Sequence, residues 1–217
     1  MAGLLDRGIY LASRSPRRRE LLTQIGVRYK LLLFRAHSGR DADVDEAPLE
    51  GEAPAAYVER VARIKAEAGW ASLAQRNLPR APVLAADTTV ALDAAILAKP
   101  ADRHHAAEML RSLSGRRHEV LTAVALKHDE RLESALSRSE VEFKPLGDEE
   151  IRQYVASGQC DDKAGAYAIQ GRAARFVVEL RGSYSGVMGL PLYETGMLLE
   201  RLARAGEPKP SVRRGAR

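Results

Sequence analysis

The hydrophobic and polar positions of the chain alternate between a pattern typical of buried strands and a pattern typical of amphipathic helices. Short apolar runs predict strands at 9–12, 28–34, 82–86, 117–127, 134–144 and 175–181. Apolar residues spaced three or four positions apart predict helices at 16–25, 54–75, 102–113, 147–157 and 188–204. This mixed order of strands and helices predicts an α/β or α+β architecture.

Local signals define the first helix most clearly. Ser15 is a suitable N-cap, and Pro16 fits the first helical position because an N–H there would have no partner within the helix. Leu21, Leu22 and Ile25 share one face, which we expect to be buried. The polar segment 35–54 is expected to be a loop.

Composition supports one folded domain. Of the 217 residues, 45% are apolar and 29% are charged, which argues against wholesale disorder. No apolar stretch is long enough for a signal peptide or a membrane span. The single cysteine, Cys160, excludes an internal disulfide and a zinc site with several thiolates. We therefore expect a cytoplasmic protein that has no membrane segment.

The net charge of +5 is concentrated at the C-terminal end. Residues 201–217 contain six basic side chains and one acidic side chain, so the preceding 200 residues are neutral overall. An evenly basic chain would suggest binding to nucleic acid. Because the excess lies at the end, nucleic acid is not the partner that we expect. The pattern predicts a single domain over 1–204 and a basic, disordered tail over 205–217.

The turn between the first strand and the first helix is a candidate anion-binding site. N–H groups at a helix N-terminus attract anions, and Ser13 and Ser15 add hydroxyl donors. Arg17 and Arg18 add guanidinium groups. The glycine-rich run of a Walker A loop is missing. The alternative interpretation is a capped helix with a solvated basic face.

Carboxylates occur in two places where they could serve chemistry. Asp87 stands at the predicted end of strand 82–86, where α/β proteins place ligands. It could bind Mg²⁺ or orient a water, or it could end the strand in an Asx turn. The second place is the acidic loop with Asp41, Asp43, Asp45 and Glu46. Its spacing is not that of an EF-hand, and a solvated loop is the simpler interpretation.

Two glycine-bounded segments near the C-terminus carry further polar groups. Gly165 and Gly171 flank an apolar stretch that includes Gln170, whose amide could read the edge of a nucleobase. The alternative is an exposed glutamine in a short strand. Segment 182–191, rich in Gly and Ser, could form a second anion-binding loop. The histidines have no metal-binding spacing, so surface or supporting roles are expected.

Taken in order, these segments resemble the Maf family of nucleoside triphosphate pyrophosphatases. The resemblance begins with LASRSPRRRELL at 11–22 and continues through ADT at 86–88 and KP at 99–100. It ends with DKAGAYAIQG at 162–171 and GSYSGVMGLP at 182–191. Shorter matches lie at 44–46, 51–52, 61–66 and 114–120. Each segment is weak alone, but their order over residues 11–191 makes chance improbable.

The resemblance implies an elongated, two-lobed α/β fold with a central mixed sheet, flanking helices and a nucleotide cleft, the Maf or ITPase-like fold. It implies a homodimer in many members. It also implies hydrolysis between the α- and β-phosphates with a divalent cation, Mg²⁺ or Mn²⁺, giving a monophosphate and pyrophosphate. The segment AYAIQG resembles the branch that hydrolyses dTTP and UTP. Modified pyrimidine nucleotides stay open as substrates.

The matching positions imply roles for individual residues. Asp87 is expected to be the general base or to orient the water, and to bind the metal together with Glu46. Lys99 is expected to be a further catalytic residue. The expected substrate-binding residues are Ser13, Ser15, Arg17, Arg18, Lys65, Thr88, Lys163 and Gln170. Arg14 stands where the family usually has a small or uncharged residue, which leaves open a phosphate contact or an exposed side chain.

A second class of function remains possible at this point. The chain could be a non-catalytic nucleotide- or nucleic-acid-binding regulator linked to cell division, with the basic tail as its contact. The presence of Asp87, Lys99 and Gln170 together weighs against a loss of catalysis.

Overall fold

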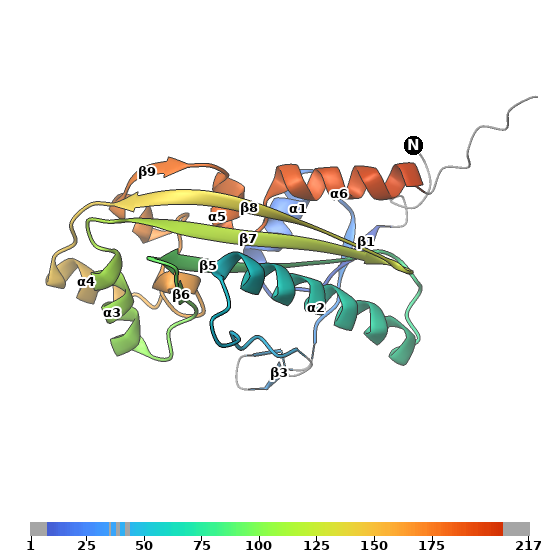
Figure 1. Ribbon diagram of the computed structural model, residues 1–217, viewed down its shortest axis with the longest axis horizontal. Coiled ribbons are helices and arrows are strands. Elements are labelled where there is room, and N and C mark those ends of the chain that lie inside the picture. The colour runs from blue at the N-terminus through green and yellow to red at the C-terminus, as the bar shows by residue number, and fades with distance from the viewer. Residues whose placement is uncertain (1–7, 35, 38–39, 42–43, 206–217) are drawn as a thin grey trace, which may run out of the picture.

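The computed structural model describes residues 8–34, 36–37, 40–41 and 44–205 (Figure 1). The strands are β1 (Ile9–Leu11), β2 (Tyr29–Leu31), β3 (Ala36–His37), β4 (Arg40–Asp41), β5 (Val83–Leu92), β6 (Ala95–Leu97), β7 (Arg117–His128), β8 (Arg131–Phe143) and β9 (Val177–Arg181). The helices are α1 (Pro16–Gln24), α2 (Pro54–Gln75), α3 (Arg103–Leu113), α4 (Asp148–Ala156), α5 (Tyr184–Met188) and α6 (Leu192–Ala205). Two short 3₁₀ helices are η1 (Ala164–Ala166) and η2 (Arg172–Phe176).

A central seven-stranded mixed sheet forms the long axis of the molecule (Figure 1). Its order is β2-β1-β5-β7-β8-β9, and β6 pairs with β5. Strand β1 is parallel to both β2 and β5. The pairs β5–β7, β7–β8 and β8–β9 are antiparallel. This confirms the predicted mixed α/β fold with a central sheet and flanking helices.

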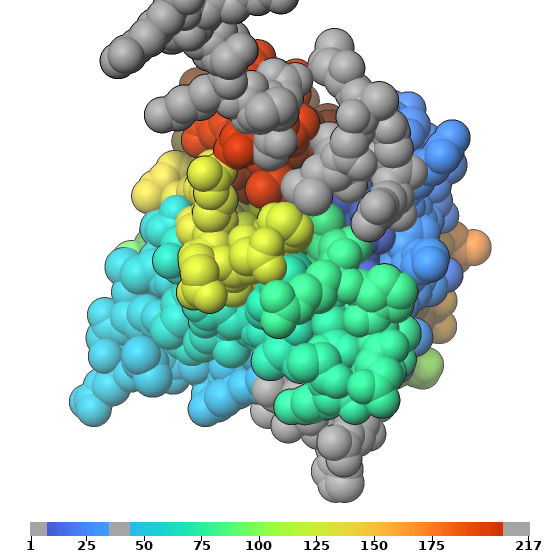
Figure 2. Space-filling model, turned by 90° about the vertical axis from the view of Figure 1, so that its right-hand side faces the viewer, coloured from blue at the N-terminus to red at the C-terminus, as the bar shows by residue number. Residues whose placement is uncertain are grey.

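Helices cover both faces of the sheet and create separate hydrophobic clusters (Figure 1). Helix α2 packs on one face with Val61 and Ala66 in its cluster, and α6 packs on the other face with Leu198 and Leu202. At the far end, α3, α4 and η2 build a third cluster around Phe143. Figure 2 shows the opposite end, where the turn between β7 and β8 lies between α2 and α6. None of the helices in the described part of the chain is long and apolar enough to cross a membrane.

Strand β5 is longer than predicted, and this changes the position of Asp87. The strand runs to Leu92, so Asp87 lies in its middle and the prediction that it ends the strand was wrong. The reason is the neighbouring strand: β7 continues the ladder, with Thr88 opposite Thr122 and Val90 opposite Val120. The β-branched threonines after Asp87 suit this extended pairing.

Other boundaries also differ from the predictions. The segment expected to be a loop contains the short hairpin β3–β4, and Asp43 lies outside the described residues. Ile25 is 39% exposed because α1 ends before it. The last helix starts at Leu192 because Gly189, with a φ of +113°, ends α5 in a left-handed conformation. Beyond Ala205, the predicted tail lies outside the described residues.

Of the surface and supporting roles expected for the histidines, His118 has a buried position that suits a supporting role. His118 is 3% exposed and lies in an aromatic cluster with Phe143 and Tyr167. Its Nε2 is 2.9 Å from the Tyr167 hydroxyl. Burial lowers the pKa of His118 from its ordinary 6.5 to about 4, so the ring is neutral at pH 7.

This buried ring predicts a pH-dependent difference in stability between wild type and a His118→Gln variant. Below pH 6.5 the unfolded chain binds a proton at His118, whereas the native state does so only near pH 4. The free energy of unfolding of the wild type therefore falls over this window by about 3 kcal/mol relative to the variant. Urea unfolding at several pH values between 4 and 7.5 measures the effect, and parallel curves for the two proteins would contradict it.

Candidate active site

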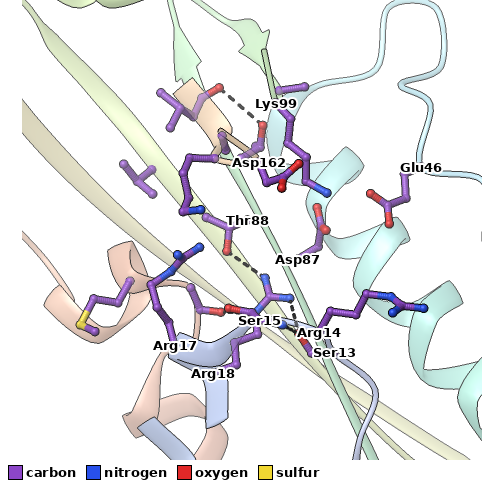
Figure 3. A pocket seen from close by; sticks show the side chains of 18 of the residues that line it. Ser13, Arg14, Ser15, Arg17, Arg18, Glu46, Asp87, Thr88, Lys99 and Asp162 are labelled. Carbon is purple, nitrogen blue, oxygen red and sulfur yellow. Dashed lines mark hydrogen bonds between the residues drawn. The ribbon is translucent and has the colours of Figure 1, made fainter. Parts of the chain in front are cut away.

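A cavity of about 570 Å³ lies between the turn from β1 into α1, strand β5 and helix α2, and it has the size of a small-molecule site (Figure 3). Every residue that the sequence predicted for substrate binding or catalysis lines it. These are Ser13, Ser15, Arg17, Arg18, Glu46, Lys65, Asp87, Thr88, Lys99, Lys163 and Gln170. They come from segments that are far apart in the sequence, so the fold brings the whole predicted set together.

The turn from β1 into α1 forms one wall of the cavity (Figure 3). Pro16 begins the helix as predicted, and Ser15 occupies the N-cap position, but its side chain makes no capping hydrogen bond. The Ser15 N–H instead donates to Ser13 Oγ at 3.2 Å. Because the cap hydroxyl does not cover the first turn of α1, the N–H groups there can receive an anion.

Arg18 ties this wall to two other elements. Its Nε donates to the Gly189 carbonyl at 2.7 Å, and its two terminal nitrogens donate to Ser13 Oγ and Thr88 Oγ1, each at 3.3 Å. Buried Thr122 supports this junction, since its hydroxyl lies 2.8 Å from the Gly186 carbonyl and 3.0 Å from Thr88 Oγ1. Arg18 therefore positions the turn and strand β5; its expected phosphate contact stays a prediction.

The segment predicted as a second anion-binding loop has a different arrangement. Ser183 caps the short helix α5 by accepting the Gly186 N–H at 3.0 Å, and Ser185 Oγ accepts the Leu192 N–H at 3.1 Å. These hydroxyls thus hold α5 and the start of α6. The contribution of this segment to the cavity wall comes from Val187, Met188 and Gly189.

Lys65 lies between two carboxylates on the opposite wall. Its Nζ is 2.7 Å from Asp87 Oδ1 and 2.9 Å from Glu46 Oε1. Lys65 follows Val61 by one helical turn, so it falls on the buried face of α2 and faces strand β5. The Tyr57 hydroxyl donates to the Glu46 carbonyl at 3.1 Å, which holds the Glu46 segment against the same helix.

Electrostatic contacts keep Lys65 and Glu46 charged despite their burial. Burial raises the pKa of Glu46, but the nearby charges of Lys65, Lys99 and Arg18 outweigh it and bring the pKa below its ordinary value. Burial lowers the pKa of Lys65, but Asp87 and Glu46 outweigh it and raise the pKa above its ordinary value. Lys65 is therefore an ammonium at neutral pH and does not act as a base.

The two carboxylates fit a divalent cation. Both are hard oxygen donors, and each contacts the Lys65 ammonium through one oxygen, which leaves its second oxygen for a cation. Within the described ranges, no three His, Cys, Asp or Glu side chains form a metal cluster. Mg²⁺ is commonly held by one or two carboxylates together with substrate phosphates and waters. Glu46 and Asp87 supply the protein part of such a site. Of the other loop acids, Asp45 lines the cavity and accepts the Ala47 N–H at 2.9 Å.

Three cations gather on the remaining side of the cavity. Burial lowers the pKa of Lys163, and the nearby charges of Arg17 and Lys99 lower it further, although Asp162 and Asp161 act in the opposite direction. Burial also lowers the pKa of Arg17. Among the described residues, none of these three cations forms an ion pair with a carboxylate. Their mutual repulsion is relieved by a bound anion, so the cluster indicates a highly charged anionic ligand.

Gln170 stands on a turn at the rim of the cavity. The Gly171 N–H donates to the Ala168 carbonyl at 2.9 Å, which closes the turn around Gln170. The Gln170 side chain is exposed and lines the cavity, but it stands on a turn and not in the short strand of the alternative interpretation. An exposed amide that faces a cavity can exchange its water for the polar edge of a ligand.

Comparison with known proteins shows the family of this chain. The sequence profile of the Maf-like protein family matches residues 8–202. The chain belongs to the Maf family. A dTTP/UTP pyrophosphatase of Aromatoleum aromaticum is 61% identical over 88% of this chain and 94% of its own. One from Nitrosomonas europaea is 58% identical over 88% of this chain and 93% of its own.

Among solved structures, the Staphylococcus aureus Ham1 protein aligns with this Maf protein at a TM-score of 0.48 and 15% identity. The alignment covers 92% of this chain and 99% of that one.

The structure of this Maf protein also reveals cavity residues that the sequence analysis did not assign. Tyr167 lines the cavity and contacts His118, and Asp162 lies beside Lys163 on the same wall. Both residues belong to the segment 162–171, so the resemblance of that segment to the family motif was the signal that could have identified them. Arg14 is exposed, lines the cavity and donates to the Phe34 carbonyl, which ties the turn after β1 to the segment after β2.

Proposed function

We propose that this Maf protein is a nucleoside triphosphate pyrophosphatase that hydrolyses dTTP and UTP to the monophosphate and pyrophosphate. The observation that carries the proposal is the cavity in which the Glu46–Lys65–Asp87 contact faces the cations Arg17, Lys99 and Lys163. The names of the relatives, dTTP/UTP pyrophosphatase, support the choice of substrate.

The charge distribution suits a triphosphate better than a neutral ligand. Attack of water on a triphosphate is opposed by its negative charge, so catalysis requires fixed positive groups and a positioned water. Arg17, Lys99 and Lys163 bind the phosphates, together with the hydroxyls of Ser13 and Ser15 and the N-terminus of α1.

Asp87 orients the attacking water and accepts its proton. One carboxylate oxygen contacts Lys65, which fixes the carboxylate, and the second oxygen can face the water. Glu46 and Asp87 would hold Mg²⁺ or Mn²⁺, which when bound neutralises charge on the phosphate oxygens. The positive charge of Lys65 reduces the repulsion between the two carboxylates and so keeps them close together.

The Gln170 amide recognises the base. Thymine and uracil share an O4 acceptor next to an N3–H donor, and a carboxamide complements this pair with one donor and one acceptor. Modified pyrimidines that keep this edge are candidate substrates for the same reason. A homodimer and a cytoplasmic location stay predictions.

A nucleotide screen with product analysis tests the proposal. We expect dTTP and UTP to be hydrolysed in preference to purine nucleotides and dCTP with Mg²⁺ or Mn²⁺, and chelation of the metal to abolish turnover. The products should be pyrophosphate and monophosphate in equal amounts, measured by ion-exchange chromatography. Release of orthophosphate would indicate cleavage of another bond. No hydrolysis of any nucleotide would favour the non-catalytic regulator.

A further inference from the structure

Two side chains from outside the cavity hold the turn that carries Gln170. Tyr154, on α4, accepts the Ala168 N–H at its hydroxyl oxygen at 3.1 Å, where the turn begins. Gln159, just after α4, accepts the Arg172 N–H at its Oε1 at 2.8 Å, where the turn ends. Neither Tyr154 nor Gln159 lines the cavity. The segment around α4 thus fixes the turn from behind.

Gln159 is fitted closely to the end of this turn. A Cβ atom placed on Gly171 would lie 2.4 Å from Gln159 Oε1, well inside van der Waals contact. The amide oxygen therefore lies directly against the Gly171 backbone, and it can reach the Arg172 N–H only because residue 171 has no side chain. The Gln159 amide oxygen thus occupies the space that a side chain at residue 171 would take, and its hydrogen bond with the Arg172 N–H ties the end of the turn to the segment after α4.

The position of Gln170 matters because an amide alone does not distinguish the bases. Guanine presents an O6 acceptor next to an N1–H donor, which is the same pair as O4 and N3–H of thymine. The two bases differ in reach, since the edge of a purine lies farther from the sugar than the edge of a pyrimidine. Selectivity therefore depends on the distance between the Gln170 turn and the phosphate-binding cations, of which Arg17 and Lys99 come from other parts of the chain.

We propose that Gln159 is a positioning residue that sets pyrimidine selectivity by fixing how far the Gln170 amide reaches into the cavity. This rests on the proposed function, in which Gln170 pairs with the base of the substrate. Gln159 touches neither the substrate nor the reacting atoms; it acts through the Arg172 N–H and the turn.

Two substitutions of similar size test this role. Gln159→Met keeps the length of the side chain but loses the oxygen acceptor, whereas Gln159→Glu keeps an oxygen at that position. We expect Gln159→Met to lower the ratio of kcat/KM for dTTP over that for dGTP about tenfold. The change should arise from KM for dTTP, with kcat close to wild type. Gln159→Glu should retain the wild-type ratio.

A double-mutant cycle with Gln170→Ala separates this role from a general effect on folding. If Gln159 acts through Gln170, Gln159→Met will not lower the dTTP/dGTP ratio further when Gln170 is alanine. An equal additional loss in that background, or an unchanged ratio in folded Gln159→Met, overturns the proposal. If Gln159→Met does not fold, Tyr154→Phe replaces it, because it removes the acceptor at the other end of the turn and should shift the ratio in the same direction.

Binding of the monophosphates distinguishes this proposal from the proposed function. A wild-type protein that hydrolyses neither dTTP nor UTP overturns the proposed function. In that case, the affinities for dTMP and dGMP, measured by titration calorimetry, still test the role of Gln159 independently of hydrolysis. A preference for dTMP in the wild type that is lost in Gln159→Met supports it, and the same relative affinities in both proteins overturn it.

Discussion

Replacement of Asp87 by asparagine is expected to lower kcat for dTTP hydrolysis by at least about 10²–10³-fold. Asparagine keeps the shape of the side chain but carries no charge and does not accept a proton from water. It also removes one of the two carboxylates that contact Lys65 and that fit a divalent cation. Because the phosphate-binding cations are unchanged, the KM for dTTP should change much less than kcat.

A steady-state assay of pyrophosphate release with saturating Mg²⁺ or Mn²⁺ measures the effect. Asp93→Asn is the matched control, since Asp93 is an exposed carboxylate in the turn after the same strand. The control should keep wild-type activity. Turnover near the wild-type rate in Asp87→Asn, with metal present, would show that another residue activates the water.

Replacement of Lys65 by methionine is expected to lower the free energy of unfolding at pH 7 by about 3 kcal/mol or more. Methionine fills most of the same space on the buried face of α2 but leaves the carboxylates of Glu46 and Asp87 without the ammonium between them. Removing one member of a buried ion pair leaves an uncompensated charge, which costs more than the pair itself contributes.

The pH dependence of this loss separates electrostatics from packing. In the wild type, nearby cations lower the pKa of Glu46, so its stabilising contribution is present above pH 4.5 and is lost as the pH falls through the lowered pKa. Without Lys65, burial favours the protonated carboxyl. The difference between variant and wild type should therefore be smaller at pH 4 than at pH 7, as measured by urea unfolding.

Added metal gives a second readout of the same variant. If Glu46 and Asp87 hold a divalent cation, Mn²⁺ or Mg²⁺ should restore part of the lost stability of Lys65→Met at pH 7. Lys30→Met, a change at an exposed lysine, is the control and should alter neither the stability nor its response to metal. An equal loss of stability at every pH, with no effect of metal, would contradict the electrostatic explanation.

The accuracy of the sequence predictions depended on how local each signal was. Helices α1 and α2 and the pair β7–β8 were found close to their true positions because apolar spacing and caps are properties of neighbouring residues. The end of β5 was missed because it depends on pairing with β7, which is distant in the chain. The short elements η1 and α5 were missed because their glycine-containing segments carry little periodic signal, and η2 was missed because five residues are too few to show a helical period.

The membership of the site was predictable from the sequence, whereas its contacts were not. The eleven residues that motifs identified all line one cavity, although Tyr167 and Asp162, which line it too, were not assigned. Lys65 was named only as one cation among several, and nothing in its own segment indicates that it lies between Glu46 and Asp87. For Gln170 the sequence left open a base-reading amide or an exposed residue of a short strand, and the fold places the exposed side chain on a turn at the cavity.

The sequence by itself determined which chemical groups this protein has and the short segments that carry them, because serine caps, strand and helix periods and glycine turns act over a few residues. Only the tertiary structure decided which groups touch. Arg18 donates to Gly189 across 171 positions, and Lys65 meets Asp87 only because α2 packs on β5. Such contacts depend on how whole elements bury their apolar faces against one another, and no local pattern encodes that outcome.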